Sequence, residues 1–207
     1  MKTNKKALAR LSRYRETLCL YQSYGTQTFF SCDLAKTLGL TAAQVRKDFS
    51  TFGIKGKKKV GYDTSGLIAL IEEILGKNIE KTAVLCGLGD LGSAMLKEEV
   101  LRAANVRIIA AFDDRPDRKN CTVPVYPLDK LTEVVKKNDV RFGIIATTNG
   151  KAQRFLDHLV LAGVTGILSF SARELKTPKH CVIGTINPAQ EMQNVIYFAN
   201  KLVRTRS

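Results

Sequence analysis

Apolar residues near the amino terminus recur at spacings of three and four, which is the period of an α-helix. The residues that share this face are Leu8, Leu11, Tyr14, Leu18 and Tyr21. A short second helix is predicted from its N-cap Ser31 to Gly39, and a third over residues 42–50, where Thr41 precedes Gln44 in a capping-box spacing. Two short helices joined by a few residues that include a glycine predict a helix-turn-helix.

The third predicted helix has apolar residues on one side only. Val45 and Phe49 predict its buried face, and small or polar residues lie on or near the outward side. The latter are Ala42, Ala43, Gln44, Arg46 and Lys47. The second helix of a helix-turn-helix enters the major groove of DNA, where its amino-terminal residues reach base edges. We therefore expect DNA contacts from Ala43 onward, with Arg46 as the base reader because a guanidinium fits guanine bidentately.

A basic segment, residues 52–62, follows the third helix. Three lysines lie between its glycines, with β-formers on both sides, which predicts a two-stranded ribbon with a cationic tip, or wing. A solvated loop has the same composition, but its position after a helix-turn-helix favours the wing. We expect these lysines to contact phosphates or a minor groove, and three arginines of the first helix to contact phosphates or to pair across the domain interface. The residues are Lys57, Lys58 and Lys59 in the wing, and Arg10, Arg13 and Arg15 in the helix.

The pattern changes after one more predicted helix, which is capped by Thr64 or Ser65 and closed by Gly76. Apolar segments that predict strands then alternate with predicted helices, which indicates a mostly parallel sheet with right-handed crossovers. The strand segments are 83–86, 107–112, 142–146 and 166–169. We expect an α/β chain in three parts: a winged-helix domain (1–79), a doubly wound Rossmann domain (80–186) and a carboxy-terminal helix (187–207).

The first predicted strand runs into a GxGxxG motif with a helix after it, the context of a dinucleotide-binding loop. The motif is Gly87, Leu88, Gly89, Asp90, Leu91 and Gly92, and its glycines permit a tight turn, approach of the pyrophosphate and close helix packing. The next strand ends in Asp113, whose carboxylate can accept from both hydroxyls of an adenosine ribose, so NAD(H) is favoured. Arg115 can bind the 2′-phosphate of NADP(H), so NADP(H) remains an alternative ligand. A Rossmann domain that binds no nucleotide is a further alternative.

Charge separates the two modules. The chain has 207 residues and a net charge of +14. Residues 1–60 hold 13 Lys and Arg against 3 Asp and Glu, whereas the remainder holds 20 against 16. The excess positive charge therefore belongs to the predicted winged helix, and it indicates a polyanionic partner such as double-stranded DNA.

Cysteine usage and the amino terminus bear on the compartment. Five cysteines without a CxxC pair argue against a disulfide framework or a structural zinc site, and they favour a reducing cytoplasm. The amino terminus lacks the apolar segment of a secretory signal, and no apolar run approaches the roughly 18 residues of a membrane span. We expect a cytoplasmic protein.

No catalytic set accompanies the glycine motif in the sequence. Neither His158, between apolar residues of a predicted helix, nor His180, in a predicted loop, belongs to a dehydrogenase acid–base arrangement. The second module also leaves no room for a substrate domain, so a sensor is favoured over an enzyme and no metal site is expected. A small NAD-dependent oxidoreductase with a basic appendage is the alternative. For a regulator, NADP(H), another nucleotide or thiol oxidation at Cys19, Cys32 or Cys121 is an alternative signal.

Three segments resemble the Rex family of redox-sensing transcriptional repressors. They are TAAQVRKDFSTFGIKGKKKVGYD (41–63), GLGDLGSAML (87–96) and FDDRPD (112–117), and the likeness runs from residue 9 to residue 202. The resemblance implies a homodimer that binds operator DNA through winged helices and reads the NADH/NAD⁺ ratio through Rossmann domains. It also implies that high NADH releases the DNA, and that the last helix swaps into the partner subunit.

The last helix has one apolar stripe, and Pro188 suits its first turn. The stripe consists of Met192, Val195, Ile196, Ala199, Leu202 and Val203. Such periodicity fits equally a helix that covers its own sheet, so swapping rests on the resemblance alone.

The sequence departs from the family in three places near the implied nicotinamide. The family usually has Asp and a bulky apolar residue where this chain has Asn187 and Pro188, and a Tyr where it has Glu98. The strand-end loop is Ala146, Thr147, Thr148 and Asn149, where the family is usually more apolar. These differences lead to the hypothesis that nucleotide binding persists, with Thr147 and Thr148 in the site, while the NADH response is weakened, altered or lost.

Overall fold

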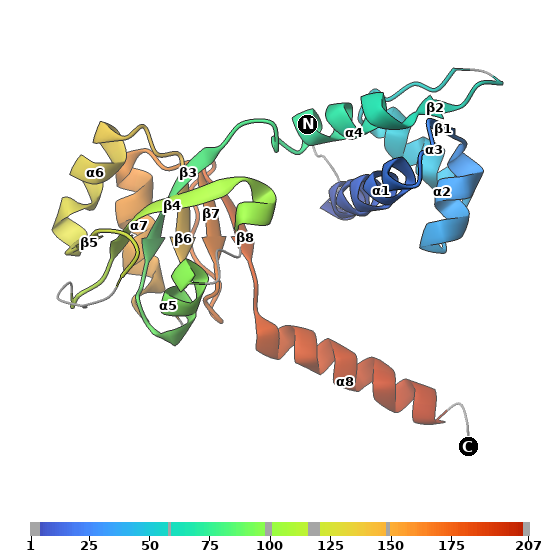
Figure 1. The fold of residues 1–207 in the computed structure, drawn as a ribbon. Helices are drawn as coiled ribbons and strands as arrows, with labels where there is room; N and C mark the ends of the chain where they lie inside the picture. The colour runs from blue at the N-terminus through green and yellow to red at the C-terminus, as the bar shows by residue number, and fades with distance from the viewer. Residues whose placement is uncertain (1–4, 58, 98–100, 116–120, 148–149, 205–207) are drawn as a thin grey trace. The chain divides into compact units, whose positions relative to one another are not determined.

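The chain divides into two compact units, Met1–Ile79 and Glu80–Ser207, each with its own apolar core (Figure 1). The computed structural model describes residues 5–57, 59–97, 101–115, 121–147 and 150–204. Among the helices in these ranges, none is long and apolar enough to cross a membrane.

The described residues of the amino-terminal unit form four helices and one small antiparallel sheet. Its elements are α1 (Lys5–Ser23), β1 (Thr28–Phe29), α2 (Ser31–Leu38), α3 (Ala42–Thr51), β2 (Tyr62–Asp63) and α4 (Thr64–Ile74). The core lies where α1 meets the other helices: Leu11, Tyr14 and Leu18 are fully buried, and the ring of Tyr14 packs edge-on against Phe49 of α3 with centroids 5.6 Å apart. Leu8, predicted on the same face, is 40 % exposed, so the buried stripe of α1 is shorter than the periodicity indicates.

Side-chain caps set the helix boundaries of this unit. The predicted cap of α3 is confirmed, because Thr41 Oγ1 accepts the N–H of Gln44 at 3.1 Å. Ser31 is the first helical residue of α2 and not its N-cap, which is Phe30; the Phe30 N–H donates to the Asp33 carboxylate at 2.8 Å. The N-cap of α4 is Asp63, which accepts the N–H of Gly66, and not Thr64 or Ser65.

The basic segment 52–62 is less regular than the predicted two-stranded ribbon. Its described strand pairing is a single antiparallel bridge between Lys57 and Gly61, and β2 pairs instead with β1. Gly61 has a φ of +89° and Lys59 a φ of +64°, so the backbone turns tightly here. Glycine also disfavours extended strands, which explains why the β-formers around it do not form a longer ladder.

The carboxy-terminal unit contains a sheet of six parallel strands in the order β5-β4-β3-β6-β7-β8. The strands are β3 (Lys81–Cys86), β4 (Val106–Phe112), β5 (Val125–Tyr126), β6 (Phe142–Ile145), β7 (Gly166–Ser169) and β8 (Val182–Thr185). The strand order reverses between β3 and β6, as in doubly wound dinucleotide-binding folds. The four predicted strands and the fold class are confirmed, whereas the short outer strands β5 and β8 are not among the predicted elements.

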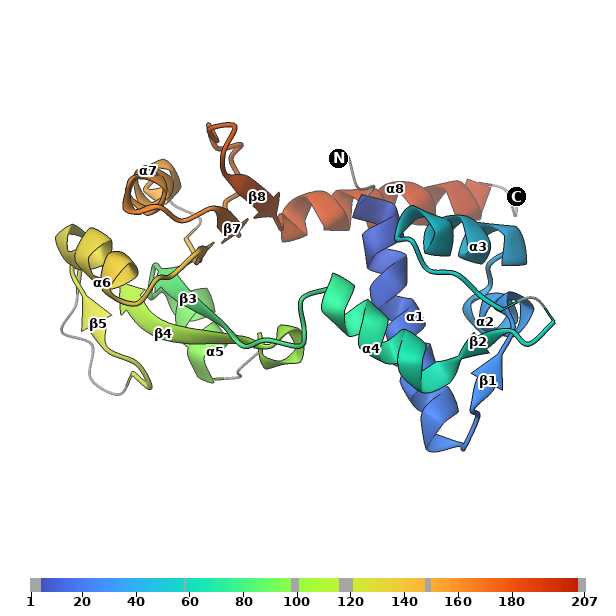
Figure 2. The same ribbon diagram turned by 90° about the horizontal axis from the view of Figure 1, so that it is seen from above.

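Helices cover both faces of this sheet. They are α5 (Asp90–Lys97), α6 (Leu131–Lys137) and α7 (Ala152–Ala162). Figure 2 shows α5 on the opposite side from α6 and α7. Side chains of β3 alternate accordingly: Val84 joins the cluster under α6 and α7, and Leu85 joins the one under α5.

The last described element is α8 (Pro188–Arg204), a helix with an exposed apolar stripe. The five large side chains of this stripe are between 51 % and 67 % exposed. They are Met192, Val195, Ile196, Leu202 and Val203. An exposed apolar surface of this kind marks a contact with another molecule.

Candidate functional site

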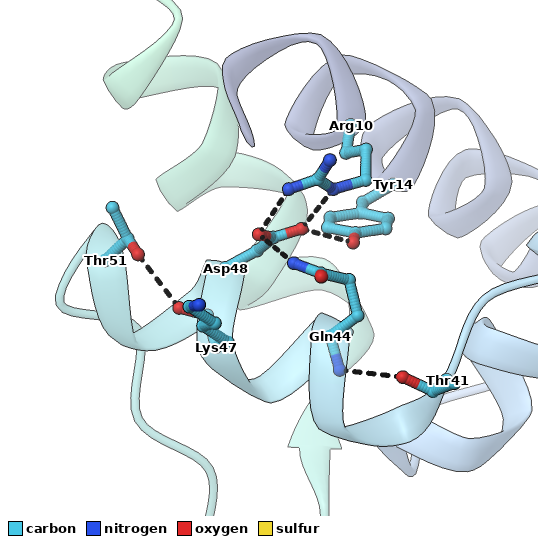
Figure 3. A network of polar contacts seen from close by, with 7 residues as sticks. All are labelled: Arg10, Tyr14, Thr41, Gln44, Lys47, Asp48 and Thr51. Atoms are coloured by element: carbon cyan, nitrogen blue, oxygen red, sulfur yellow. Dashed lines mark hydrogen bonds and ion pairs between the residues drawn. The ribbon is translucent and has the colours of Figure 1, made fainter. Parts of the chain in front are cut away.

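The recognition-type helix α3 is fastened to α1 by a carboxylate with only 3 % of its side chain exposed, that of Asp48 (Figure 3). Arg10 of α1 donates to it twice, from Nε to Oδ2 at 2.6 Å and from Nη2 to Oδ1 at 2.7 Å. The Tyr14 hydroxyl donates to Oδ2 at 2.7 Å, and Gln44 Nε2 donates to Oδ1 at 2.8 Å. Each carboxylate oxygen therefore accepts two hydrogen bonds, which is the capacity of an ionised Asp.

These contacts determine the charge state of the network. Burial alone would raise the pKa of Asp48, but hydrogen bonds from Arg10, Tyr14 and Gln44 outweigh it and hold that pKa below its usual value of 3.8. Burial, followed by the hydrogen bond to Asp48, raises the pKa of Tyr14. The helix is therefore held by a pair that is charged at neutral pH, and removing one partner of such a buried pair typically costs about 3–5 kcal/mol.

The outward side of α3 carries the residues that the sequence predicts for DNA. Ala43, Arg46 and Lys47 are exposed, and Gln44 is half-buried beside Asp48. Arg46 is also held by a neighbour, since its Nη1 donates at 3.1 Å to the hydroxyl of Ser31, which is 9 % exposed at the start of α2. The side chains of Gln44 and Arg46 are thus both oriented by hydrogen bonds.

The other predicted DNA-contacting cations divide into exposed and paired residues. Arg13 on α1 and Lys57 and Lys59 in the turn are exposed, whereas Lys58 lies outside the described residues. For Arg10 and Arg15 the expectation of phosphate or interdomain contacts stays a prediction. Arg10 pairs with Asp48, and Arg15 pairs with Glu72 of α4, both within the amino-terminal unit. The sequence did not indicate these pairs, because their members lie far apart along the chain.

The glycine motif forms the turn from β3 into α5. Gly87 has a φ of +97°, and a Cβ at Gly92 would lie 2.0 Å from the carbonyl oxygen of Gly87, so neither position tolerates a side chain. A Cβ at Gly89 would meet nothing within 4 Å, so this backbone faces open space. These are the three roles that the motif predicts for a loop that approaches a phosphate.

Asp113, at the end of β4, is joined to that loop. Its Oδ2 accepts the N–H of Leu88 at 2.7 Å, and its Oδ1 accepts the N–H of Arg115 at 3.0 Å. Because each carboxylate oxygen has two acceptor sites, one site on each oxygen is left for a ribose hydroxyl. The predicted acid is thus oriented beside the loop by hydrogen bonds within the chain.

The carboxyl ends of β3, β4 and β6 enclose a cavity of about 530 Å³ beside these residues. This volume lies within the usual range of small-molecule sites. The cavity is lined by Gly87, Gly89, Asp90, Leu91, Asp113, Asp114, Arg115, Ala146, Thr147, Lys151 and Phe155. Thr148 and Glu98 lie outside the described residues. Within the described ranges, no group of three or more His, Cys, Asp or Glu is arranged to hold a metal ion.

Three lining residues, Asp114, Lys151 and Phe155, are absent from the predicted site. Lys151 forms an ion pair with Asp114 in the lining of the cavity, and Arg154 Nη1 lies 3.9 Å from the same carboxylate. The hydrogen bond from Lys151 lowers the pKa of Asp114. The signal for these residues is topological: they follow β4 and β6, and carboxyl ends of neighbouring parallel strands meet at one edge.

At the start of α8, Asn187 has a structural role as a helix cap. Asn187 Oδ1 accepts the N–H of Ala189 at 3.1 Å and that of Gln190 at 3.3 Å, so Asn187 is the N-cap and Pro188 opens the first turn. Met192 and Ile196 follow on the exposed apolar stripe. The helix therefore carries its own start signal.

Comparisons with known proteins match both units. Residues 4–50 match the family described as putative DNA-binding protein N-terminus, and residues 78–173 match the CoA binding domain family. The chain is 34 % identical over 192 residues to the redox-sensing transcriptional repressor Rex of Limosilactobacillus reuteri (strain DSM 20016), covering 91 % of this chain and 90 % of that protein.

Two solved structures have the same fold. The crystal structure of RSP in complex with β-NAD⁺ and operator DNA matches with a TM-score of 0.91 and 24 % identity, over 100 % of this chain and 96 % of that one. The structure of RSP in complex with β-NADH matches with a TM-score of 0.84 and 24 % identity, over 100 % and 98 % of the two chains.

Proposed function

This chain belongs to the Rex family of redox-sensing transcriptional repressors, and on that premise we propose that it regulates transcription by binding operator DNA under the control of NAD(H). Residues 1–79 bind the DNA, residues 80–186 bind the dinucleotide and residues 187–207 join two subunits. The protein acts in the cytoplasm, which fits its unpaired cysteines.

The observation that carries this proposal is that α3 has a fixed orientation and an exposed cationic face. Arg46 and Lys47 are exposed on a helix that the buried Asp48 holds in one orientation. A helix with a fixed orientation and cationic side chains on its free face meets the requirements for entering a major groove. The excess positive charge of residues 1–60 supplies the attraction to phosphates that most DNA-binding proteins use.

The homodimer is supported by the exposed stripe of α8. Its five large apolar side chains lie in solvent in a single chain, and a second copy of this chain offers a symmetric way to cover them. Swapping of α8 into the partner subunit is the arrangement that the family resemblance implies. Two-fold symmetry then predicts a palindromic operator with half-sites separated by one or more helical turns.

NAD(H) is the proposed cofactor because of Asp113. Its carboxylate faces the loop with acceptor sites left for both ribose hydroxyls, and its negative charge would repel the 2′-phosphate of NADP(H). RSP, the structure similar to this one, contains β-NAD⁺ in one crystal and β-NADH in another. Arg115 is exposed beside Asp113, so NADPH belongs among the ligands to be tested.

The chain acts as a regulator and not as an enzyme, like the repressors that it resembles over 91 % of its length. A small NAD-dependent oxidoreductase is the alternative. It would consume NADH in the presence of candidate substrates and would bind no palindromic duplex.

The alternative within the family is a response to NADH that is weaker than, or different from, that of its other members. Asn187 carries no charge and its side-chain oxygen already caps α8, which limits its use in a redox-dependent hydrogen-bond switch. Under this alternative a labelled operator duplex would stay bound when NADH replaces NAD⁺, whereas control by NAD(H) predicts its release. Release of the duplex by micromolar NADH, with no effect of NAD⁺, would contradict this alternative.

One experiment tests the site, its specificity and the coupling together. NADH, NAD⁺ and NADPH are titrated into the full-length protein with and without a palindromic duplex selected from random sequences. Gly92→Ala serves as the site variant, because its Cβ collides with the Gly87 carbonyl, and Gly184→Ala on β8, where a Cβ would lie 3.7 Å from the nearest atom, serves as the matched control. Absence of any enriched palindrome, or nucleotide binding that persists unchanged in Gly92→Ala, would contradict the proposal.

A further inference from the structure

Gln44 stands in the first turn of α3, and its amide group has a fixed orientation. The two ends of a Gln amide look alike in shape but differ in chemistry, since the nitrogen donates and the oxygen accepts. Here the chemistry of Asp48 determines which end of the Gln44 amide faces it. An ionised carboxylate can only accept, so the nitrogen must face it, as the 2.8 Å bond from Nε2 to Oδ1 records.

The carboxylate of Asp48 is itself fixed in orientation. Asp48 is held by both donors of the Arg10 fork and by the Tyr14 hydroxyl, all at 2.6–2.7 Å. An amide flipped by 180° would set Gln44 Oε1 against Asp48 Oδ1, two acceptors in a buried setting where unpaired polar groups are costly. Arg10, Tyr14 and Asp48 therefore act as positioning residues for Gln44.

The rest of the Gln44 amide is one acceptor, Oε1, and the second N–H of Nε2. The backbone N–H of Gln44 is already bonded to Thr41, so the side chain alone can make new contacts. Its neighbours on the free side of α3, Ala43 and Lys47, are exposed. An acceptor and a donor side by side match adenine, which presents the N6 donor and the N7 acceptor in the major groove.

We propose that Asp48, by fixing the amide of Gln44, makes Gln44 a reader of adenine in each half-site; this rests on the proposed DNA-binding function. Guanine offers only the acceptors O6 and N7 in the major groove, so the fixed Oε1 would lose its partner there. Thymine presents an acceptor and a methyl group, and fails for the same reason. Specificity thus originates partly in α1, a helix that need not contact a base.

The test begins with the full-length wild-type protein and a library of random duplexes, which yields the palindromic half-site. Binding is then measured to duplexes that carry each base at each position of that half-site. For the wild type we expect one symmetric pair of positions where adenine exceeds guanine by about tenfold to a hundredfold. In Gln44→Met, which has similar size but no amide, this ratio should fall to within about threefold of one while other positions keep their preferences.

Two further variants separate reading from general damage. Gln22→Met makes the same replacement at an exposed glutamine of α1 and should leave every preference unchanged. Asp48→Asn removes the acceptor-only partner, so the Gln44 amide can flip and the adenine-to-guanine ratio should fall about threefold or more. Circular dichroism melting checks that each variant is folded at the assay temperature. If Asp48→Asn is unfolded, the base preferences of Gln44→Met alone test the proposal.

The outcomes distinguish this inference from the proposed function. If the wild type enriches no palindrome, the proposed function fails. If it enriches one but Gln44→Met keeps all base preferences, only the inference is overturned, and Gln44 is merely a brace for Asp48. A folded Asp48→Asn variant with wild-type adenine preference would overturn the positioning role of Asp48.

Discussion

The helices α1 and α8 make a useful pair, because each is long and each has one apolar stripe, yet the stripes meet different surroundings. In α1, Leu11, Tyr14 and Leu18 are fully buried against the other helices of the amino-terminal unit. In α8, Met192 and Ile196 are more than half exposed. The same periodicity therefore predicts a helix with an apolar face but not the molecule that covers that face.

The two helices also differ in polar support. Beside its stripe α1 carries Arg10 and Tyr14, which connect it to Asp48, and Arg15, which pairs with Glu72 of α4. In α8, the N-cap Asn187 accepts backbone N–H groups of the first turn. Polar anchors fix α1 to one set of neighbours, whereas a capped helix with an open apolar face suits contact with a second chain. Predictions that test this contrast follow, from the largest expected effect to the smallest.

The largest effect is expected from charges on the stripe of α8. The double variant Val195→Asp/Ile196→Asp should dissociate the proposed dimer by more than about a hundredfold, because covering each apolar side chain contributes about 1.5–3 kcal/mol. Sedimentation velocity over a range of concentrations measures this. Asn194→Asp, on the other side of the helix, adds charge off the stripe and should leave the dimer intact. Dimers of equal strength in both variants would mean that α8 does not join subunits.

The next effect concerns the buried stripe of α1. Leu18→Ala should lower the free energy of unfolding by about 2–5 kcal/mol, because it leaves a cavity in a packed core. Leu20→Ala makes the same change where the side chain is 57 % exposed, and it should cost less than about 0.5 kcal/mol. Urea unfolding followed by circular dichroism gives both values, and similar losses would show that burial in α1 contributes little.

Acid should weaken the anchor of α1 without a matching effect on α8. The pKa of Asp48 is lower in the folded chain than its usual 3.8, so its stabilising contribution is complete above about pH 4 and is lost as pH falls through the folded pKa. The loss amounts to about 1.4 kcal/mol for each unit of pKa lowering. The wild type should therefore lose stability below pH 4 more steeply than Asp48→Asn, as measured by thermal melts across pH. Parallel curves would exclude this role.

The smallest effect is expected at the cap of α8. Asn187→Ala removes an acceptor for two backbone N–H groups and should cost about 1 kcal/mol of helix stability, which weakens the proposed dimer about fivefold. Asn187→Asp retains an acceptor and should preserve dimer strength. Sedimentation equilibrium resolves a difference of this size, and an unchanged dimer in Asn187→Ala would mean that α8 folds without its cap.

The sequence predicts local features of the fold better than its long-range contacts. The glycine motif, the cap Thr41 and four strands follow from neighbouring residues, because turn geometry, capping and side-chain alternation act over a few positions. The ion pairs of Asp48 with Arg10 and of Lys151 with Asp114 join segments that are distant along the chain. The spacing of residues in the sequence therefore does not predict them. These pairs fix the orientation of α3 and one wall of the cavity.

The irregular wing and the unpredicted strands β5 and β8 have the same cause. The β-formers beside the wing lysines predict a ribbon, but Tyr62 and Asp63 find a partner at Thr28 and Phe29, in a segment that the alternation pattern does not mark. Strands β5 and β8 lie at the outer edges of the sheet, where β8 leaves Val182 exposed, so their pattern is weak. Pairing between segments, rather than composition, decides where short strands form.

The buried setting of Asp48 has a consequence for ionic strength. Dissolved salt screens charges over a Debye length of about 8 Å at physiological concentration, and it acts on exposed groups far more than on buried ones. Lys47, Lys57 and Lys59 are exposed, so their attraction to phosphates falls as salt rises, whereas the Arg10–Asp48 pair is shielded from counterions. Salt is therefore expected to weaken the proposed binding to DNA while the orientation of α3 persists, so that binding returns on dilution.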